Sequence, residues 1–240
     1  MPTIYTANSD GYVRDQQSSW DAVHDNATGT AASVIDSYHS TGISAWCTAT
    51  GRSTTYYIYR SYLLFDTSGI SVAPSAATLK VYGATNSSGD IIAIEGTWNG
   101  TSTLGTGDFD SFTGFSAGWG SLNATQYSSE VSSWSTSGYN DITLNAAALA
   151  KMASADVLSV VLMNHTYDYM DATPNLGGRT GCVTEKNGLQ FADQSGTSKD
   201  PYVDYTSGGY VNDPLGHDMD DIDSKVIGVE SGDISKVSGT

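Results

Sequence analysis

The sequence predicts an all-β protein, an antiparallel β-sandwich of jelly-roll type with one short helix and a flexible C-terminal tail. Short runs rich in Tyr, Ile, Leu and Val are bounded by clusters of Gly, Ser, Asn, Asp and Pro, as in a sandwich. Charged residues make up only 15% of the chain, whereas it holds 26 glycines and 15 tyrosines, a composition that suits sheet surfaces and long loops. Only one segment has a helical pattern.

Six segments have the apolar pattern of strands. In the first of them, alternation places Leu63 and Phe65 on one face. In the second, Leu79 and Val81 point inward, whereas Lys80 points outward. The predicted strands are 54–67, 76–85, 89–98, 139–145, 157–165 and 201–206.

The predicted helix covers residues 145–156. Asn145 is a suitable N-cap, and Leu149 and Met152 are three residues apart on one face. A single short helix among many strands fits a crossover at one end of a sandwich rather than a βαβ protein.

A long segment, 99–138, combines many glycines and serines with several aromatic residues. Disordered linkers rarely carry so many rings, so we expect an ordered loop packed over the sandwich edge. Exposed aromatic side chains on a sandwich can form a platform for a sugar. The candidate glycan-binding residues are Trp98, Trp119, Tyr127 and Trp134. The alternative, that these rings only cover the core, stays open.

The pattern divides the chain into a sandwich domain, 1–206, and a tail, 207–240. The tail begins as an acidic linker and then repeats Ser-Lys-Val at 224–226 and 235–237, an offset of eleven residues. Such short apolar pieces bury little surface alone and need neighbouring chains or another surface. We therefore expect Val226, Ile227, Val229 and Val237 to serve in assembly.

The run RSYLLFDTSGISVAPSAATLKVYG (60–83) resembles the signature of the DNRLRE-type β-sandwich domains. Thr67 stands where that family usually has Leu, and the insert at 99–138 is longer than is typical. The segments 139–152 and 189–206 resemble the family's strand before a short helix and its closing strand pair, so that the resemblance covers about residues 50–206. The matching residues of the first run are Arg60, Leu63, Phe65, Asp66, Ser68, Ala77, Thr78, Leu79 and Tyr82.

The resemblance implies a non-catalytic module of the kind found on extracellular surfaces and in structural proteins of bacterial viruses. The repeats at the C-terminus likewise resemble short repeats at the ends of bacteriophage tail and fibre proteins. The start of the chain has no basic and apolar signal segment. We therefore expect synthesis in a host cytoplasm and a place on the virion exterior, with an extracellular location as the alternative.

The formal net charge of −16 makes nucleic acid and membranes poor candidate partners. The chain has two cysteines, Cys47 and Cys182, which are too few for a disulfide scaffold or a zinc site. They either pair with each other or stay buried as free thiols.

The ionisable residues do not form a known catalytic motif, so no catalytic residue, cofactor or metal site is assigned. His24, between Asp21 and Asp25, is the best local cluster for a metal or an acid–base pair, but a solvated loop histidine is the default expectation. Ca²⁺ is a further candidate at Asp108 and Asp110 or at the acidic run 217–223, which a solvated linker also explains.

The expected function is that of a non-catalytic virion structural protein: a capsid decoration, head fibre or tail-associated fibre. Its expected partners are other virion proteins, further copies of itself and, where it is adhesive, a host-surface polysaccharide. The alternative is a carbohydrate-binding module or surface adhesin. A divergent hydrolase is a third candidate, and turnover of a polysaccharide would identify it.

Overall fold

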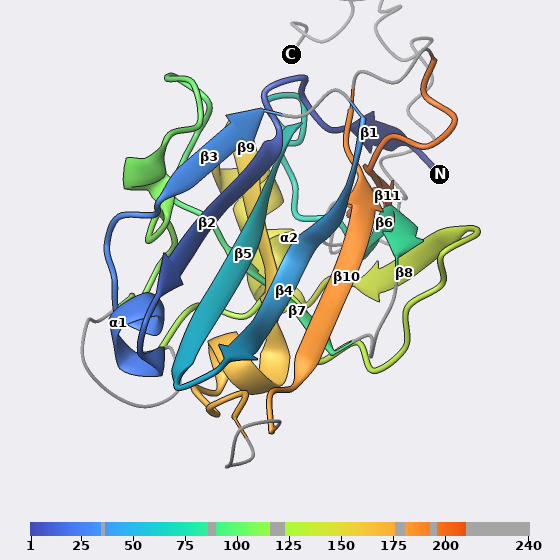
Figure 1. The fold of residues 1–240 in the computed structure, drawn as a ribbon. Coiled ribbons are helices and arrows are strands. Elements are labelled where there is room, and N and C mark those ends of the chain that lie inside the picture. The colour runs from blue at the N-terminus through green and yellow to red at the C-terminus, as the bar shows by residue number, and fades with distance from the viewer. Residues whose placement is uncertain (35–36, 86–89, 116–122, 176–180, 193–195, 210–240) are drawn as a thin grey trace, which may run out of the picture.

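The computed structural model describes residues 1–34, 37–85, 90–115, 123–175, 181–192 and 196–209 (Figure 1). These residues form an antiparallel β-sandwich, as the sequence predicts. The strands are β1 (Thr3–Tyr5), β2 (Gly11–Gln17), β3 (Ala31–Val34), β4 (Tyr38–Thr50), β5 (Ser53–Asp66), β6 (Ala76–Thr85), β7 (Ile91–Glu95), β8 (Tyr139–Thr143), β9 (Val157–Asn164), β10 (Thr184–Gln190) and β11 (Tyr202–Thr206). The helices are α1 (Trp20–His24) and α2 (Ala146–Ser154), with a 3-10 turn, η1 (Thr106–Asp108), and a π-turn, η2 (His165–Tyr169).

The strands form two layers. The first sheet has the order β1-β11-β6-β8, and the second has the order β3-β2-β5-β4-β10. Strand β5 pairs with β2 along one edge, and along the other with β4 over its first half and with β9 over its second half. Strand β7 lies outside β9, and β6 joins the two sheets through its last residues, which pair with β10.

The main core lies between the sheets. Leu79 of β6 pairs with Val203 of β11 and Ile142 of β8, and all three side chains are fully buried. They pack against Leu63 and Phe65 of β5. Helix α2 closes one end of this core with Ala148 and Met152.

A second core covers the opposite face of the second sheet. Ile58, Tyr62 and Leu64 of β5 belong to it, whereas Leu63 and Phe65 belong to the first core, because successive side chains of a strand point to opposite faces. Helix α1 and the segment 98–112 form the outer layer of this second core. The loop predicted to pack over an edge therefore contributes a third layer of the molecule.

Most of the predicted elements are confirmed. Strand β6 matches its predicted range, and Asn145 caps α2 by accepting hydrogen bonds from the amides of Ala147 and Ala148. Strands β1 to β4, strand β10 and helix α1 are not among the elements predicted from the strand and helix patterns. Strand β11 ends at Thr206, where the predicted domain ends. The assembly residues Val226, Ile227, Val229 and Val237 lie outside the described residues, and the tail stays a prediction.

A disulfide joins Cys47 of β4 to Cys182, just before β10, with a Cα–Cα distance of 5.2 Å. Of the two alternatives for the cysteines, the structure shows the paired one. Because 135 positions separate the two cysteines, the link restrains a long stretch of the unfolded chain.

Candidate functional site

The structure does not expose the aromatic side chains predicted to bind a glycan. Trp98 is 5% exposed, Trp134 4% and Tyr127 0%, and Trp119 lies outside the described residues. The Trp134 indole donates a hydrogen bond to the carbonyl of Gly188, and Tyr127 packs in the core between the sheets. These three rings cover the core, which was the alternative interpretation, so the predicted platform is wrong for them.

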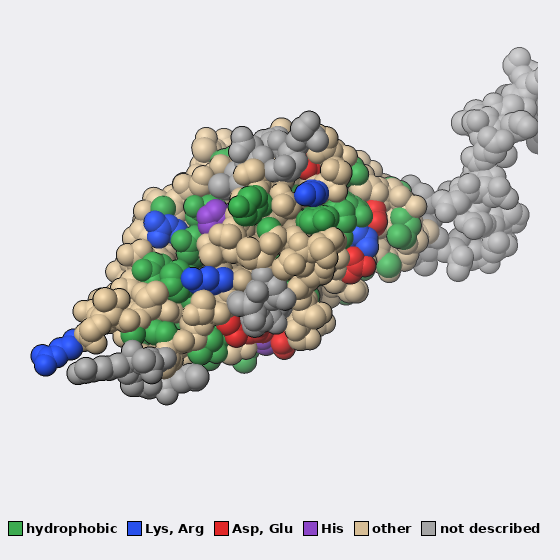
Figure 2. Space-filling view, turned by 45° about the vertical axis from the view of Figure 1, so that its right-hand side comes forward, with side chains coloured by type: hydrophobic (Ala, Val, Ile, Leu, Met, Phe, Trp, Pro, Cys, Tyr) green, Lys and Arg blue, Asp and Glu red, His purple; other side chains and the backbone are tan. Residues whose placement is uncertain are grey.

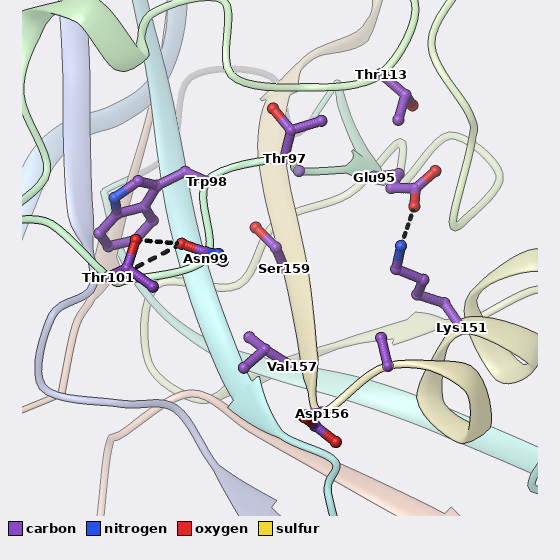
Figure 3. Close-up of a pocket in the computed structure, with 12 residues that line it drawn as sticks. Glu95, Thr97, Trp98, Asn99, Thr101, Thr113, Lys151, Asp156, Val157 and Ser159 are labelled. Carbon is purple, nitrogen blue, oxygen red and sulfur yellow. Dashed lines mark hydrogen bonds and ion pairs between the residues drawn. The ribbon is translucent and has the colours of Figure 1, made fainter.

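A cavity of about 530 Å³ lies beside Trp98 (Figure 3). Its walls come from the end of β7, the segment 96–101, the end of α2 and the start of β9. Among its described lining residues, the ionisable side chains are Glu95, Lys151 and Asp156. Glu95 and Lys151 form an ion pair of 2.9 Å, so that they largely neutralise each other. The cavity can hold a small polar solute, but its one aromatic ring faces the core.

A partly exposed aromatic surface lies elsewhere, on the second sheet. It lies on the same face of that sheet as Leu63 and Phe65, in the part that the first sheet leaves uncovered. We call it the open face; Figure 2 shows basic side chains lying among hydrophobic ones on the surface of the molecule. All of its side chains are half-buried, with one side toward solvent. They are Tyr12 and Arg14 of β2, His39 and Trp46 of β4, Tyr57 and Tyr59 of β5, and Lys186 of β10.

Strand register brings these residues together. Trp46 lies opposite Tyr57, so the two share a row across β4 and β5. In the neighbouring row, Tyr59 lies opposite Arg14 of β2 on one side and Ser44 of β4 on the other, and Ser44 in turn lies opposite Lys186 of β10. Directly paired residues of an antiparallel sheet point to the same face.

The rings of the open face form two stacked groups. Trp46 and Tyr57 stack with ring centroids 4.0 Å apart and an interplanar angle of 8°, and the Lys186 ammonium lies 3.4 Å from the Trp46 centroid. In the second group, Tyr12 contacts His39 at 4.1 Å and Tyr59 at 5.4 Å between centroids. The Arg14 guanidinium lies 5.8 Å from the centroid of the same Tyr59 ring. Contacts of this kind hold flexible cations in place.

The electrostatics of the open face follow from partial burial. Burial, reinforced by the nearby Arg14, lowers the pKa of His39. His39 is therefore neutral at pH 7. Burial also lowers the pKa of Lys186, but the group stays half-exposed and keeps its charge at pH 7. The surface thus presents two cations, Arg14 and Lys186, between aromatic rings.

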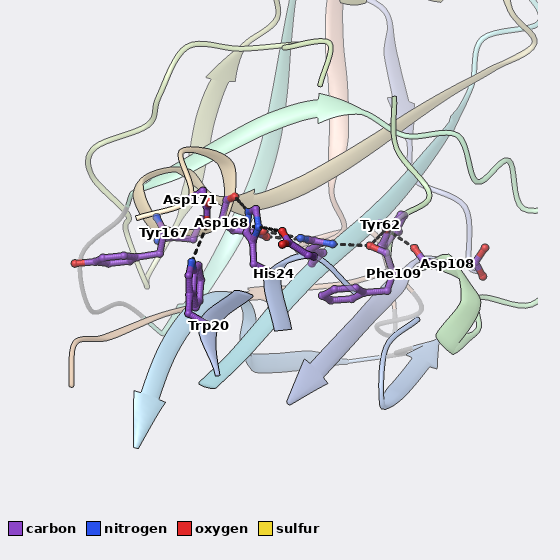
Figure 4. A network of polar contacts seen from close by, with 11 residues as sticks. Trp20, His24, Tyr62, Asp108, Phe109, Tyr167, Asp168 and Asp171 are labelled. Atoms are coloured by element: carbon purple, nitrogen blue, oxygen red, sulfur yellow. Dashed lines mark hydrogen bonds and ion pairs between the residues drawn. The ribbon is translucent and has the colours of Figure 1, made fainter. Parts of the chain in front are cut away.

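The opposite face of the same sheet holds a buried polar network (Figure 4). Arg60 is fully buried and donates to both carboxylate oxygens of Asp168, at 2.9 and 2.6 Å. It also donates to the carbonyl of Phe109 at 2.8 Å and lies 4.0 Å from the Phe109 ring centroid. Tyr62 donates to the carbonyl of Asp108. Burial lowers the pKa of Arg60, but Asp168 more than offsets this and raises it above its ordinary value.

His24 belongs to this network and is not a solvated loop residue, so that expectation is wrong. Its side chain is 2% exposed, with Nε2 at 2.8 Å from the carbonyl of Asp168 and Nδ1 at 2.8 Å from Asp25. Asp171, which also accepts a hydrogen bond from the Trp20 indole, lies 3.5 Å from the same Nδ1. The Nε2 contact thus joins α1 to η2, whereas Nδ1 faces the carboxylates of Asp25 and Asp171. The predicted neighbour Asp21 is exposed on α1.

The calcium candidate Asp108 bonds to groups of its own turn. Asp108 accepts hydrogen bonds from the amide of Gly105 at 2.8 Å and the hydroxyl of Ser111 at 3.1 Å, so its carboxylate caps the η1 turn. Burial raises the pKa of the neighbouring Asp110. The acidic run 217–223 lies outside the described residues.

The open face is not predicted from the sequence, although part of its signal is present there. In β5, the half-exposed Tyr57 and Tyr59 alternate with the buried Tyr56 and Ile58. That alternation predicts two exposed tyrosines on one face. The partners from β2, β4 and β10 could not be found, because the pairing of those strands was not known.

None of the helices in the described part of the chain is long and apolar enough to cross a lipid bilayer. A scan against protein-family models and a search of curated proteins gave no match.

Proposed function

We propose that this chain is a non-catalytic structural protein on the exterior of a bacteriophage particle and that its open face binds a host-surface polysaccharide. The open face is the observation that carries the proposal. Aromatic rings and tyrosine hydroxyls suit the C–H faces and hydroxyls of a sugar. Arg14 and Lys186 suit carboxylates or other anionic substituents, which guanidinium and ammonium groups bind well.

Charge favours an anionic polysaccharide over a neutral one. The whole chain has a formal net charge of −16 and only ten lysines and arginines. Arg14 and Lys186 nevertheless lie on the same face of the sheet, at the two ends of a row that runs through Tyr59 and Ser44. A strongly acidic protein repels an anionic chain in general, so local cations are needed to hold it.

The place on a particle rests on other observations. The residues 60–83 resemble the DNRLRE-type domains, and the repeats at 224–239 resemble those of tail and fibre proteins. Disulfides such as Cys47–Cys182 persist in oxidising surroundings outside cells, which supports external display. On this proposal the tail attaches the sandwich to other virion proteins or to further copies of the chain.

The binding proposal is tested with Trp46→Ala. Trp46 lies between Tyr57 and Lys186, so its loss removes the support of both, and we expect retention on an immobilised uronate-rich polysaccharide to fall at least tenfold, or about 1.4 kcal/mol. The measurement is affinity electrophoresis, with far-UV circular dichroism to verify the fold. The matched control is Tyr5→Ala, an exposed tyrosine of the first sheet, which should bind normally. Unchanged binding by Trp46→Ala would contradict the proposal that the open face binds the polysaccharide.

The display proposal has its own test. Antibodies against the sandwich should label intact particles, and the protein should form a defined oligomer that is lost on deletion of 210–240. The alternative, a free-standing carbohydrate-binding module or adhesin, predicts a monomer that binds polysaccharide equally well with and without those residues. Light scattering of the two chains distinguishes the outcomes.

A further inference from the structure

Three side chains with metal-binding atoms converge at the start of β7. Asp90 precedes Ile91, which pairs with Asn164 of β9 on one side and bridges to Val131 on the other. His165 follows Asn164, and Glu130 precedes Val131. The backbone amide of His165 donates to the carbonyl of Asp90 at 3.0 Å. Three neighbouring segments thus hold the three residues in place through backbone pairing.

The ligand atoms face one another at distances that leave no hydrogen bond between them. His165 Nδ1 lies 3.6 Å from Asp90 Oδ1 and 3.6 Å from Glu130 Oε2, and all three atoms lie within 4.8 Å of one another. Asp90 Oδ1 and His165 Nδ1 are buried and have no hydrogen-bond partner among the described residues. Such buried, unsatisfied polar atoms are rare in proteins and need an explanation.

The surrounding contacts orient the cluster. The second oxygen of Asp90, Oδ2, accepts a hydrogen bond from the amide of Thr166 at 3.0 Å, which turns Oδ1 toward His165. The Tyr169 ring stacks on the imidazole at 5.8 Å between centroids and 13° between planes. The Glu130 side chain is 45% exposed, so it can move by the few tenths of an ångström that closer ligation needs.

We propose that Asp90, Glu130 and His165 bind one divalent transition-metal ion, with Zn²⁺ as the best match. Ligand bonds of about 2.0–2.2 Å place two ligands of one ion about 3–4 Å apart, and the two distances from His165 Nδ1 fall in this range. An imidazole nitrogen with two carboxylates suits Zn²⁺, whereas Ca²⁺ takes six to eight oxygen ligands. Water fills the remaining position on the solvent side of Glu130.

The bound ion cross-links the start of β7, the end of β9 and the segment before Val131. It also satisfies the two buried atoms, Asp90 Oδ1 and His165 Nδ1. A ligand that binds only the folded state stabilises it, so the unfolding temperature rises as the concentration of the ligand increases. The expected effect of the ion is therefore on the stability of the fold, and it does not depend on the proposed glycan binding.

The experiment uses the full chain, stripped with a chelator and titrated with Zn²⁺ alone. We expect one ion per chain by native mass spectrometry and a saturable rise in unfolding temperature. Ca²⁺ and Mg²⁺ at equal concentrations should bind at least tenfold more weakly. Co²⁺ should give a visible absorption spectrum of a bound ion with nitrogen and oxygen ligands.

Two variants locate the ion. Glu130→Gln keeps the size of an exposed side chain and should lower Zn²⁺ affinity at least tenfold, and His165→Asn should abolish the Co²⁺ spectrum. The matched control, Asp141→Asn, replaces an exposed carboxylate outside the cluster and should bind as the parent does. If His165→Asn fails to fold, Glu130→Gln decides. Equal binding by Glu130→Gln and the parent would overturn the proposal and point to the acidic run 217–223. The absence of any rise in unfolding temperature with Zn²⁺ would also overturn it.

Discussion

The two faces of strand β5 use charge in opposite ways. On the face that carries the second core, Arg60 is fully buried, and its donors go to Asp168 and the carbonyl of Phe109. On the open face, Tyr57 and Tyr59 are half-exposed and lie among side chains that carry Arg14 and Lys186. A charge whose donor nitrogens all bind built-in acceptors holds the fold together, whereas a half-exposed charge lies where a ligand can reach it.

The difference has a physical origin in desolvation. A buried guanidinium must have its partners built in, because an unpaired buried charge is very costly. A half-exposed cation keeps part of its hydration and can exchange it for a ligand. Substitutions in the buried network around Arg60 should therefore lower stability and spare binding, whereas those on the open face should lower binding and spare stability.

The largest effect is expected for Asp168→Asn. This change keeps the size of the side chain but leaves Arg60 buried without its counter-charge, so the free energy of unfolding should fall by about 3–5 kcal/mol in urea denaturation. The folded fraction should still bind polysaccharide. The control Asp141→Asn breaks an exposed pair with Lys80 and should cost less than about 1 kcal/mol. A similar loss in both variants would contradict the contrast between the two faces.

A smaller effect, on binding alone, is expected when Arg14 and Lys186 are both replaced by Gln. Affinity for a uronate-rich polysaccharide at low salt should fall about tenfold, or about 1.4 kcal/mol, and its dependence on salt should weaken. The free energy of unfolding should change by less than about 1 kcal/mol. Lys80→Gln, a cation of the first sheet, serves as the control. Equal binding of anionic and neutral polysaccharides by the parent protein would show that these cations do not select the ligand.

The smallest effect is a pH dependence from His39. Since burial and Arg14 lower its pKa below the ordinary value of 6.5, the unfolded chain takes up this proton first as the pH falls. The contribution of His39 to stability is complete above pH 6.5 and is lost as the pH falls through the folded pKa. His39→Gln should therefore show a slightly smaller drop in unfolding temperature between pH 8 and pH 5. An NMR titration that places the pKa of His39 above 6.5 would refute this.

Much of the fold could be predicted from local patterns. The alternation of Leu79 and Val81 with Lys80 identifies β6, and Asn145 before an alanine-rich run identifies the start of α2. By contrast, β4 has no such signal, because it is rich in Ser, Thr, Ala and Gly. Its strand conformation depends on pairing with β5, the next strand, and with β10, which is far away in sequence.

The candidate site shows the limit of such patterns more clearly. Trp46 and Trp134 are the same residue type in similar polar surroundings of the sequence, yet Trp134 is buried and Trp46 lies on the open face. Composition predicts that aromatic rings cover the core or form a binding surface, but it does not tell which side of the sheet each ring lies on.

By itself, the sequence determined the sandwich class, the position of α2 and which side chains of a strand share a face. These features depend on side-chain periodicity, which can be seen within a few residues. Tertiary structure alone decided the Cys47–Cys182 pair, the partner of Arg60 and the membership of the open face. Each of these depends on which strands become neighbours, and that is set by the combined burial of both faces of the second sheet rather than by any one segment.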